Sequence, residues 1–176
     1  THFHDDHISL ENLILRHSSE VKSNFPVRIW GAPQALDAIV NEGLPFYRIH
    51  GWDGAPNYFS SYEFCPMEPY RAYEIDGMSV TPVLAAHGGY AEGELGYNYI
   101  IKNRNGKTFL YASDTGYYED RTWDYWRTCG VRLDFAVMEC TYGDREIEDY
   151  AEGHLDFKNL RYMLQRLEQC GCLTKE

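Results

Sequence analysis

The sequence predicts an α/β domain in which helices cover a sheet. Two segments show the strand–turn–strand pattern of β-hairpins, and amphipathic helical patterns stand before and after them. Hairpins mixed with helical connections are typical of layered α/β folds. The chain has 176 residues, of which 44% are hydrophobic and 24% are charged. This is enough for one domain with a sizeable core, so we expect residues 1–176 to form a single domain.

Two helices and a strand are expected in the first part of the chain. Apolar residues recur at helical spacing over 8–23, and the short apolar run 27–30 is typical of a strand. A second helix should begin at Pro33, because proline is favoured in a first turn, and should end before Gly43. Over 44–69 the periodic pattern is lost. This aromatic-rich stretch is either a lid over a site or a loop packed against the body.

The rest of the chain is expected to supply the sheet and two more helices. Asp-Gly and Asn-Gly pairs are the strongest short-range signals of hairpin turns. Amphipathic stripes predict helices, and a continuous apolar run predicts a buried strand. The expected elements are hairpins over 70–84 and 96–112, helices over 119–129 and 157–170, and a buried strand over 133–138.

Charge and cysteine content narrow the class of protein. The formal charge of −11 disfavours extended nucleic acid as a partner but leaves room for a small anionic substrate. No apolar run approaches the roughly 18 residues of a membrane span. Five irregularly spaced cysteines argue against a disulfide framework and favour a cytoplasmic location. Cys170 and Cys172 are either a thiol pair or two small residues at a helix end. A homodimer is an alternative to a monomer that the sequence leaves open.

Four potential metal ligands occupy six positions in His2-x-His4-x-Asp6-His7. In an extended segment His2 and His4 point to the same side and can chelate one ion. If the chain then turns into a helix, Asp6 and His7 are directed to a neighbouring point. A tag remnant would instead be a uniform histidine run without spaced aspartates. The pattern therefore favours two divalent ions close together, an arrangement used in hydrolysis.

His87 and Asp114 each follow the end of an expected strand, in a loop with glycine nearby. Rigid strands hold ligands at such ends while the loops leave room for substrate. His87 would be a third nitrogen ligand for the ion of His2 and His4, and Asp114 would bridge both ions. By itself each residue is weak evidence, since an aspartate before Thr-Gly is commonly a turn or a helix cap.

Together these motifs resemble those of the metallo-β-lactamase superfamily. The opening cluster, His87 and Asp114 look like its successive metal motifs. Residues 134–142 (Asp-Phe-Ala-Val-Met-Glu-Cys-Thr-Tyr) and Gly153-His154-Leu155 resemble segments of its phosphodiesterase branch. The resemblance implies an αββα sandwich. The family's leading strands and its final metal histidine have no counterpart in 1–176, so we expect the domain to be truncated at both ends.

The resemblance implies a dinuclear metal-dependent hydrolase, and we expect a phosphodiesterase acting on a small or cyclic phosphate ester. The expected metal ligands are His2, His4, Asp6, His7, His87 and Asp114. Asp6 and His154 are the expected catalytic residues, with His154 donating a proton or holding a phosphate oxygen. Otherwise His154 is a surface residue near a helix N-terminus. Glu139 either orients a histidine from behind or is a structural carboxylate at a strand end.

Other functions stay open at this point. The same metals would serve thioester or lactone hydrolysis, although no oxyanion partner or carrier-binding surface is recognisable. Transfer-RNA processing and true lactamase activity are disfavoured, the first by the acidic balance and the second by the bridging Asp114. A non-catalytic metal-binding module is the alternative from another class. Zinc is the first choice of metal, with manganese or iron as alternatives.

Overall fold

The structure is a computed structural model that describes residues 1–18, 26–49, 61–88 and 93–174. The chain divides into two compact units. The amino-terminal unit comprises His2–Met67 and Gly89–Glu94. The sheet unit comprises Thr1, Glu68–Gly88 and Leu95–Glu176. Each unit has its own sheet and its own helices.

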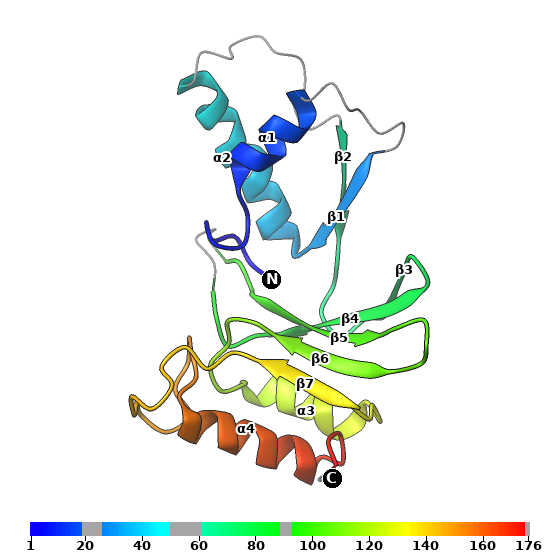
Figure 1. Ribbon diagram of the computed structural model, residues 1–176, viewed down its shortest axis with the longest axis vertical. Helices are drawn as coiled ribbons and strands as arrows, with labels where there is room; N and C mark the ends of the chain where they lie inside the picture. The colour runs from blue at the N-terminus through cyan, green and yellow to red at the C-terminus, as the bar shows by residue number, and fades with distance from the viewer. Residues whose placement is uncertain (19–25, 50–60, 89–92, 175–176) are drawn as a thin grey trace. The chain divides into compact units, whose positions relative to one another are not determined.

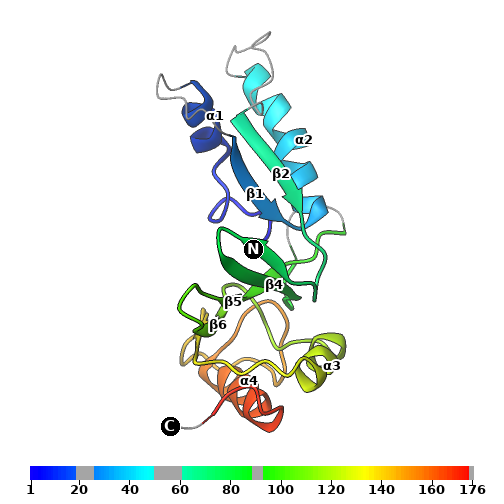
Figure 2. The same cartoon turned by 90° about the vertical axis from the view of Figure 1, so that its right-hand side faces the viewer.

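The amino-terminal unit combines a two-stranded parallel sheet with two helices. Its elements are α1 (Leu10–Ser18), β1 (Val27–Gly31), α2 (Pro33–Ile49) and β2 (Tyr62–Pro66). The two strands pair from Val27 opposite Tyr62 to Gly31 opposite Pro66. Both helices lie beside this pair of strands (Figures 1 and 2). The first turns of α2 bury an apolar stripe of Ala35, Leu36, Ala38 and Ile39.

The structure corrects two expectations for this unit. The second helix does not end before Gly43 but continues to Ile49. A glycine inside a helix costs only about 1 kcal/mol relative to alanine, so it weakens a helix without ending it. The stretch 44–69 also contains strand β2, whose alternating Tyr62 and Phe64 were a period-two signal. The centre of the stretch interpreted as a lid or a packed loop, 50–60, lies outside the described residues, as do 19–25 of the expected first helix.

The sheet unit contains a five-stranded sheet in the order β3-β4-β5-β6-β7. The strands are β3 (Tyr73–Ile75), β4 (Met78–Leu84), β5 (Tyr97–Lys102), β6 (Thr108–Ala112) and β7 (Phe135–Met138). Neighbouring strands are antiparallel except β6 and β7, which are parallel. Parallel neighbours need a crossover connection, and α3 (Asp120–Thr128) supplies it. Both expected hairpins are confirmed.

Helices α3 and α4 (Phe157–Gln169) cover the same face of this sheet (Figures 1 and 2). Alternate strand residues point toward them and are almost fully buried, as expected for the period-two pattern of a strand. The strands and helices contribute to one core of Val83, Ile100, Leu110, Trp123, Trp126, Leu155, Met163 and Leu167. This core holds the strand ends, and therefore the loops after them, in fixed positions.

The expectation of a fully buried strand over 133–138 is wrong. In β7 the side chains of Ala136 and Met138 pack against the core, whereas Phe135 is 47% and Val137 48% exposed. The helices cover one face of the sheet, and these two residues belong to the other face. Tyr111, which pairs with Val137 across β6 and β7, is exposed for the same reason. The apolar run therefore predicted the strand correctly, but it overestimated the burial, because only one face of the strand is covered.

Candidate functional site

The opening motif folds into tight turns that bring its histidines together. The amides of His7 and Ile8 both donate to the carbonyl of His4, at 3.0 Å each. His2 Nε2 lies 2.7 Å from His4 Nδ1. The ring centroids of His2 and His7 are 4.5 Å apart. Three imidazoles of one short segment thus converge, as expected of residues that share a metal centre.

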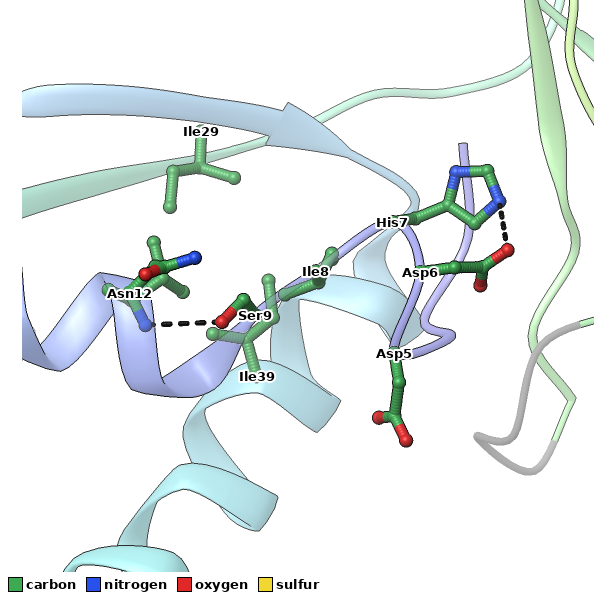
Figure 3. A pocket seen from close by; sticks show the side chains of 9 residues that line it. Asp5, Asp6, His7, Ile8, Ser9, Asn12, Ile29 and Ile39 are labelled. Atoms are coloured by element: carbon green, nitrogen blue, oxygen red, sulfur yellow. Dashed lines mark hydrogen bonds and ion pairs between the residues drawn. The ribbon is translucent and has the colours of Figure 1, made fainter.

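The two carboxyl groups beside these histidines differ in direction. Asp6 turns toward His7, with Oδ2 3.6 Å from Nε2, whereas Asp5 points away (Figure 3). The Asp6 side chain is 75% exposed, so its oxygens are accessible to an ion or a water. A hollow of about 500 Å³ adjoins this pair and has isoleucine side chains on its inner wall. Asp6 therefore sits at an open edge of the unit.

A glutamate that was not singled out from the sequence holds the opening motif in place. Glu94 is buried, and its Oε1 accepts a hydrogen bond of 2.5 Å from the amide of Phe3, between His2 and His4. A buried carboxylate that accepts a backbone amide fixes the backbone at that point. No motif or spacing in the sequence marked Glu94, because it lies far along the chain from the segment it contacts.

In the sheet unit, the four remaining site residues follow or precede regular elements. His87 follows β4, Asp114 follows β6, Glu139 follows β7, and His154 precedes α4. The loops that carry three of them are joined at one point, because Gly116 and Gly153 both donate their amides to the carbonyl of Ala86. The strand ends and this shared acceptor bring together residues that are far apart in sequence.

The ring of His87 is oriented by its own hydrogen bond. Its Nδ1 lies 2.8 Å from the carbonyl oxygen of Gly153. A carbonyl can only accept, so Nδ1 carries the proton and Nε2 carries the lone pair. A backbone carbonyl behind a ligating histidine is a common arrangement in metal sites, since it fixes both the tautomer and the ring. The donor chemistry of His87 therefore fits a divalent ion.

Glu139 joins three loops through one carboxylate. Its Oε1 accepts from His154 Nδ1 at 3.1 Å and from the amides of Leu155 and Thr115 at 3.1 and 3.3 Å. Its Oε2 accepts from the amide of Thr141 at 2.7 Å. Of the two roles left open by the sequence, the structure contains the contacts for both. Glu139 binds backbone amides and also contacts a histidine.

His154 lies between the carboxylate of Glu139 and the predicted metal ligands. Its Nδ1 is 4.0 Å from Asp114 Oδ1, and its ring centroid is 4.8 Å from that of His87. The side chain is 27% exposed, so it is not the freely solvated surface residue of the alternative interpretation. Because Glu139 holds Nδ1, Nε2 is the nitrogen left to exchange a proton with a substrate.

The loop after Glu139 adds an aromatic ring and a cation. The edge of the Tyr142 ring meets His154, with centroids 6.0 Å apart at 84°. The guanidinium of Arg145 lies 5.8 Å from the Tyr142 ring centroid. The amide of Tyr142 donates to the carbonyl of Leu155, which fixes this loop next to His154. Tyr142 belongs to the segment 134–142 whose resemblance was noted from the sequence, whereas no motif in the sequence marked Arg145.

Histidines and carboxylates held at strand ends of an α/β domain define a candidate metal centre. The model of the β-lactamase superfamily domain matches residues 1–172, and the chain belongs to the metallo-β-lactamase superfamily. The predicted fold class is confirmed. None of the curated proteins compared with the chain matches it. Among the described residues, no helix is long and apolar enough to cross a bilayer.

The chain is similar in fold to several solved structures. The chain is 21% identical to unliganded yeast PDE1, with a TM-score of 0.72, over 97% of this chain and 51% of that one. A diphosphatase of the PhnP family is 17% identical, with a TM-score of 0.63, over 96% and 54%. YhfI from Bacillus subtilis is 16% identical, with a TM-score of 0.62, over 96% and 59%. The chain spans about half the length of these proteins.

Proposed function

We propose that the protein is a dinuclear metal-dependent phosphodiesterase that hydrolyses a small or cyclic phosphate ester. The observation that carries the proposal is the arrangement of His87, Asp114, Glu139 and His154 at neighbouring loops of one sheet. It combines a preset nitrogen ligand, a carboxylate and a histidine able to transfer a proton. Membership of the superfamily and the similar PhnP-family diphosphatase support the same class of reaction.

In this proposal the metal ligands are the six residues expected from the sequence. His2, His4, Asp6 and His7 of the opening motif, together with His87 and Asp114 at strand ends, would hold the divalent ions. Imidazole and carboxylate donors fit zinc, and the carboxylates also suit manganese or iron. The ions, when bound, polarise the phosphoryl oxygens and acidify water for the attack on phosphorus.

The chain's own residues supply the proton transfers and the positioning. His154 donates a proton from Nε2 to the leaving oxygen, while Glu139 holds Nδ1 and stabilises the charged ring. Asp6, exposed beside His7, would accept the proton of the attacking water on the carboxylate oxygen that does not hold an ion. A carboxylate behind a histidine is an established way to set its tautomer and orientation. Removing Glu139 should therefore disturb His154 without removing a ligand.

A small anionic substrate agrees with the charges around His154. The net charge of −11 repels an extended polyanion, whereas Arg145 provides a local cation on the loop next to His154. A phosphate group is a good partner for arginine, because the planar guanidinium donates to two oxygens at once. Tyr142 offers a ring for an apolar or aromatic group of the ester. These two residues favour a phosphate ester over a thioester or lactone on the same metals.

The proposal is tested by turnover of bis(4-nitrophenyl) phosphate with added zinc, manganese or iron, compared with a thioester and a lactone. We expect phosphodiester hydrolysis that is lost with a chelator and restored by metal. Turnover of only the acyl substrates would support the thioester or lactone alternative. Metal binding without turnover of any substrate would support the non-catalytic module. We also propose a cytoplasmic location, because the five cysteines are free thiols. A homodimer stays a prediction.

A further inference from the structure

Three of the five cysteines gather at one end of the sheet unit. Cys129 ends α3, Cys170 ends α4, and Cys172 follows two residues later. Helix α4 has 13 residues and begins just after His154, so these thiols lie about 20 Å from the proposed catalytic histidine. In Figure 1 the C-terminal ends of the two helices lie opposite the yellow and orange loops that carry Glu139 and His154. The cluster is therefore not part of the candidate metal centre.

Two of these thiols converge on a single backbone oxygen. The Cys172 thiol donates to the carbonyl of Trp126 at 3.2 Å, and the Cys129 thiol donates to the same oxygen at 3.7 Å. The two sulfur atoms are thus neighbours, although they come from different helices and are separated by more than 40 positions. Cys170 contributes its carbonyl oxygen to this group, 3.7 Å from the sulfur of Cys172.

The environment of the two thiols differs in a way that assigns them different roles. Cys172 is 2% exposed, and burial, together with the neighbouring Cys129 and Cys170, raises its pKa to about 12. Cys129 is only partly buried. An external reagent therefore meets Cys129 first, and Cys172 is protected from direct attack.

We propose that Cys129 and Cys172 are a redox modification site, which forms an intramolecular disulfide in the presence of a small disulfide oxidant such as oxidised glutathione. The Cys129 thiolate attacks the oxidant, forms a mixed disulfide and releases one glutathione thiolate. Cys172 gives up its proton to solvent and attacks the Cys129 sulfur, which releases the second glutathione. Two protein thiols are oxidised and one glutathione disulfide is reduced to two thiols.

The backbone around the two cysteines leaves room for the bond. Gly130 follows Cys129 and Gly171 precedes Cys172, each with positive φ and with nothing within 4 Å of a Cβ built on it. Glycines give the chain freedom to bring the sulfurs to bonding distance. Cys170 is a poor partner for Cys172, because a bond across a single residue would close a strained ring. The cross-link joins the end of α3, which precedes β7 in the sequence, to the segment just after α4, which follows β7.

The test is non-reducing tryptic mass spectrometry of the purified protein after incubation with oxidised glutathione. Cys170 and Cys172 share the tryptic peptide 167–175, while Cys129 lies in 128–132. The assay is therefore run on the native protein and on Cys170→Ser. We expect the two peptides to be linked in both proteins. We also expect Cys172→Ser to accumulate a glutathione adduct on Cys129 without a cross-link.

The second measurement is the thermal stability of the protein. The disulfide closes a loop of about 40 residues and should raise Tm by on the order of 5–10 °C in oxidised relative to reduced Cys170→Ser. Cys129→Ser should show no such shift. A cross-link that disappears in Cys170→Ser would overturn the assignment of Cys172. Equal cross-linking of Cys129 to Cys65 or Cys140, or adducts alone on folded Cys170→Ser, would overturn the site itself.

Discussion

The hydrogen bond between His154 and Glu139 is the residue-scale feature on which the proposed chemistry depends most. The carboxylate that contacts His154 Nδ1 also accepts three backbone amides, so it cannot move without disturbing the loops. This arrangement favours a histidine held for proton transfer over one that is only structural. The sequence predicted an orienting role for Glu139 only as one of two alternatives. Which histidine it contacts, and with what geometry, could not be predicted, because the two residues lie on different loops.

His154→Ala should lower turnover of a phosphodiester by about 10²–10⁴-fold, the usual contribution of a positioned general acid. Metal content should stay unchanged, since His154 is not one of the proposed ligands. Steady-state kinetics and elemental analysis of the same sample check both statements. Turnover that survives the substitution would remove His154 from the mechanism, and loss of metal would make it a ligand.

Arg145→Ala should raise KM for a phosphodiester and leave kcat nearly unchanged, because the guanidinium attracts the anion without touching the reacting bond. Arg71 provides a matched control, since its guanidinium lies 5.5 Å from the Tyr73 ring in the same kind of pair. Arg71→Ala should leave both constants unchanged. A KM that responds equally to both substitutions would show that only the overall charge matters.

At the scale of elements, the start of α4 depends on one buried carboxylate. Asp156 Oδ1 accepts from the amide of Asn159 at 2.7 Å, and Oδ2 accepts from the amide of Ile147 at 2.9 Å. Burial opposes ionisation, but these hydrogen bonds outweigh it and hold the pKa of Asp156 below its usual value. Asp156 thus caps the helix and ties it to the loop that follows Arg145.

Asp156→Ala should lower the free energy of unfolding by about 1–3 kcal/mol, as expected when a buried cap is lost. Because the folded pKa is lowered, the stabilisation from ionised Asp156 is present above the unfolded pKa of about 3.9 and is lost as pH falls through the folded pKa. The pH dependence is checked by urea titrations of the native protein and of Asp156→Asn. The titrations are run at pH 6 and at pH values of 3 and below. The stability difference should shrink at low pH, and a constant difference would contradict the account.

Gly116 illustrates a position where close packing requires glycine. A Cβ there would lie 2.4 Å from the carbonyl oxygen of Ala151 and 2.5 Å from backbone atoms of Glu152. Gly116→Ala should therefore destabilise the protein by about 1–3 kcal/mol, since backbone cannot yield as a side chain can. Gly31→Ala is the control, because its nearest neighbour would be the Leu36 side chain at 3.7 Å. Equal denaturation midpoints for the two variants would contradict this explanation.

The elements that could be predicted from sequence are those with local signals. The Asp-Gly and Asn-Gly turns identified both hairpins, and Asp76 and Gly77 indeed have φ of 50° and 79°. The end of α2 was predicted too early, because Gly43 was interpreted as a stop signal although the helix continues past it. The strand β2 was missed, because the aromatic residues around it made its alternation of two hard to recognise. The exposure of Phe135 and Val137 was missed because burial of a strand face depends on distant segments.

At the scale of the whole molecule, the candidate metal ligands were the part of the site most accessible to sequence. The motif His2-x-His4-x-Asp6-His7 places four potential metal ligands within six positions, and the ends of expected strands marked His87 and Asp114. Glu94 could not be found in this way, because its role arises from a contact with Phe3, far along the chain. Arg145 contacts only the nearby Tyr142, and the place of this loop next to His154 depends on the hydrogen bond from Tyr142 to Leu155. All these residues lie within the part of the chain that matches the β-lactamase superfamily domain.

Elemental analysis of the purified protein after incubation with zinc, manganese or iron shows whether the chain holds a dinuclear metal centre. We expect two tightly held divalent ions per chain, and loss of at least one in His87→Ala and in Asp114→Asn, with His154→Ala retaining both. A single ion or none in the folded native protein, or an unchanged content in His87→Ala, would contradict the dinuclear centre.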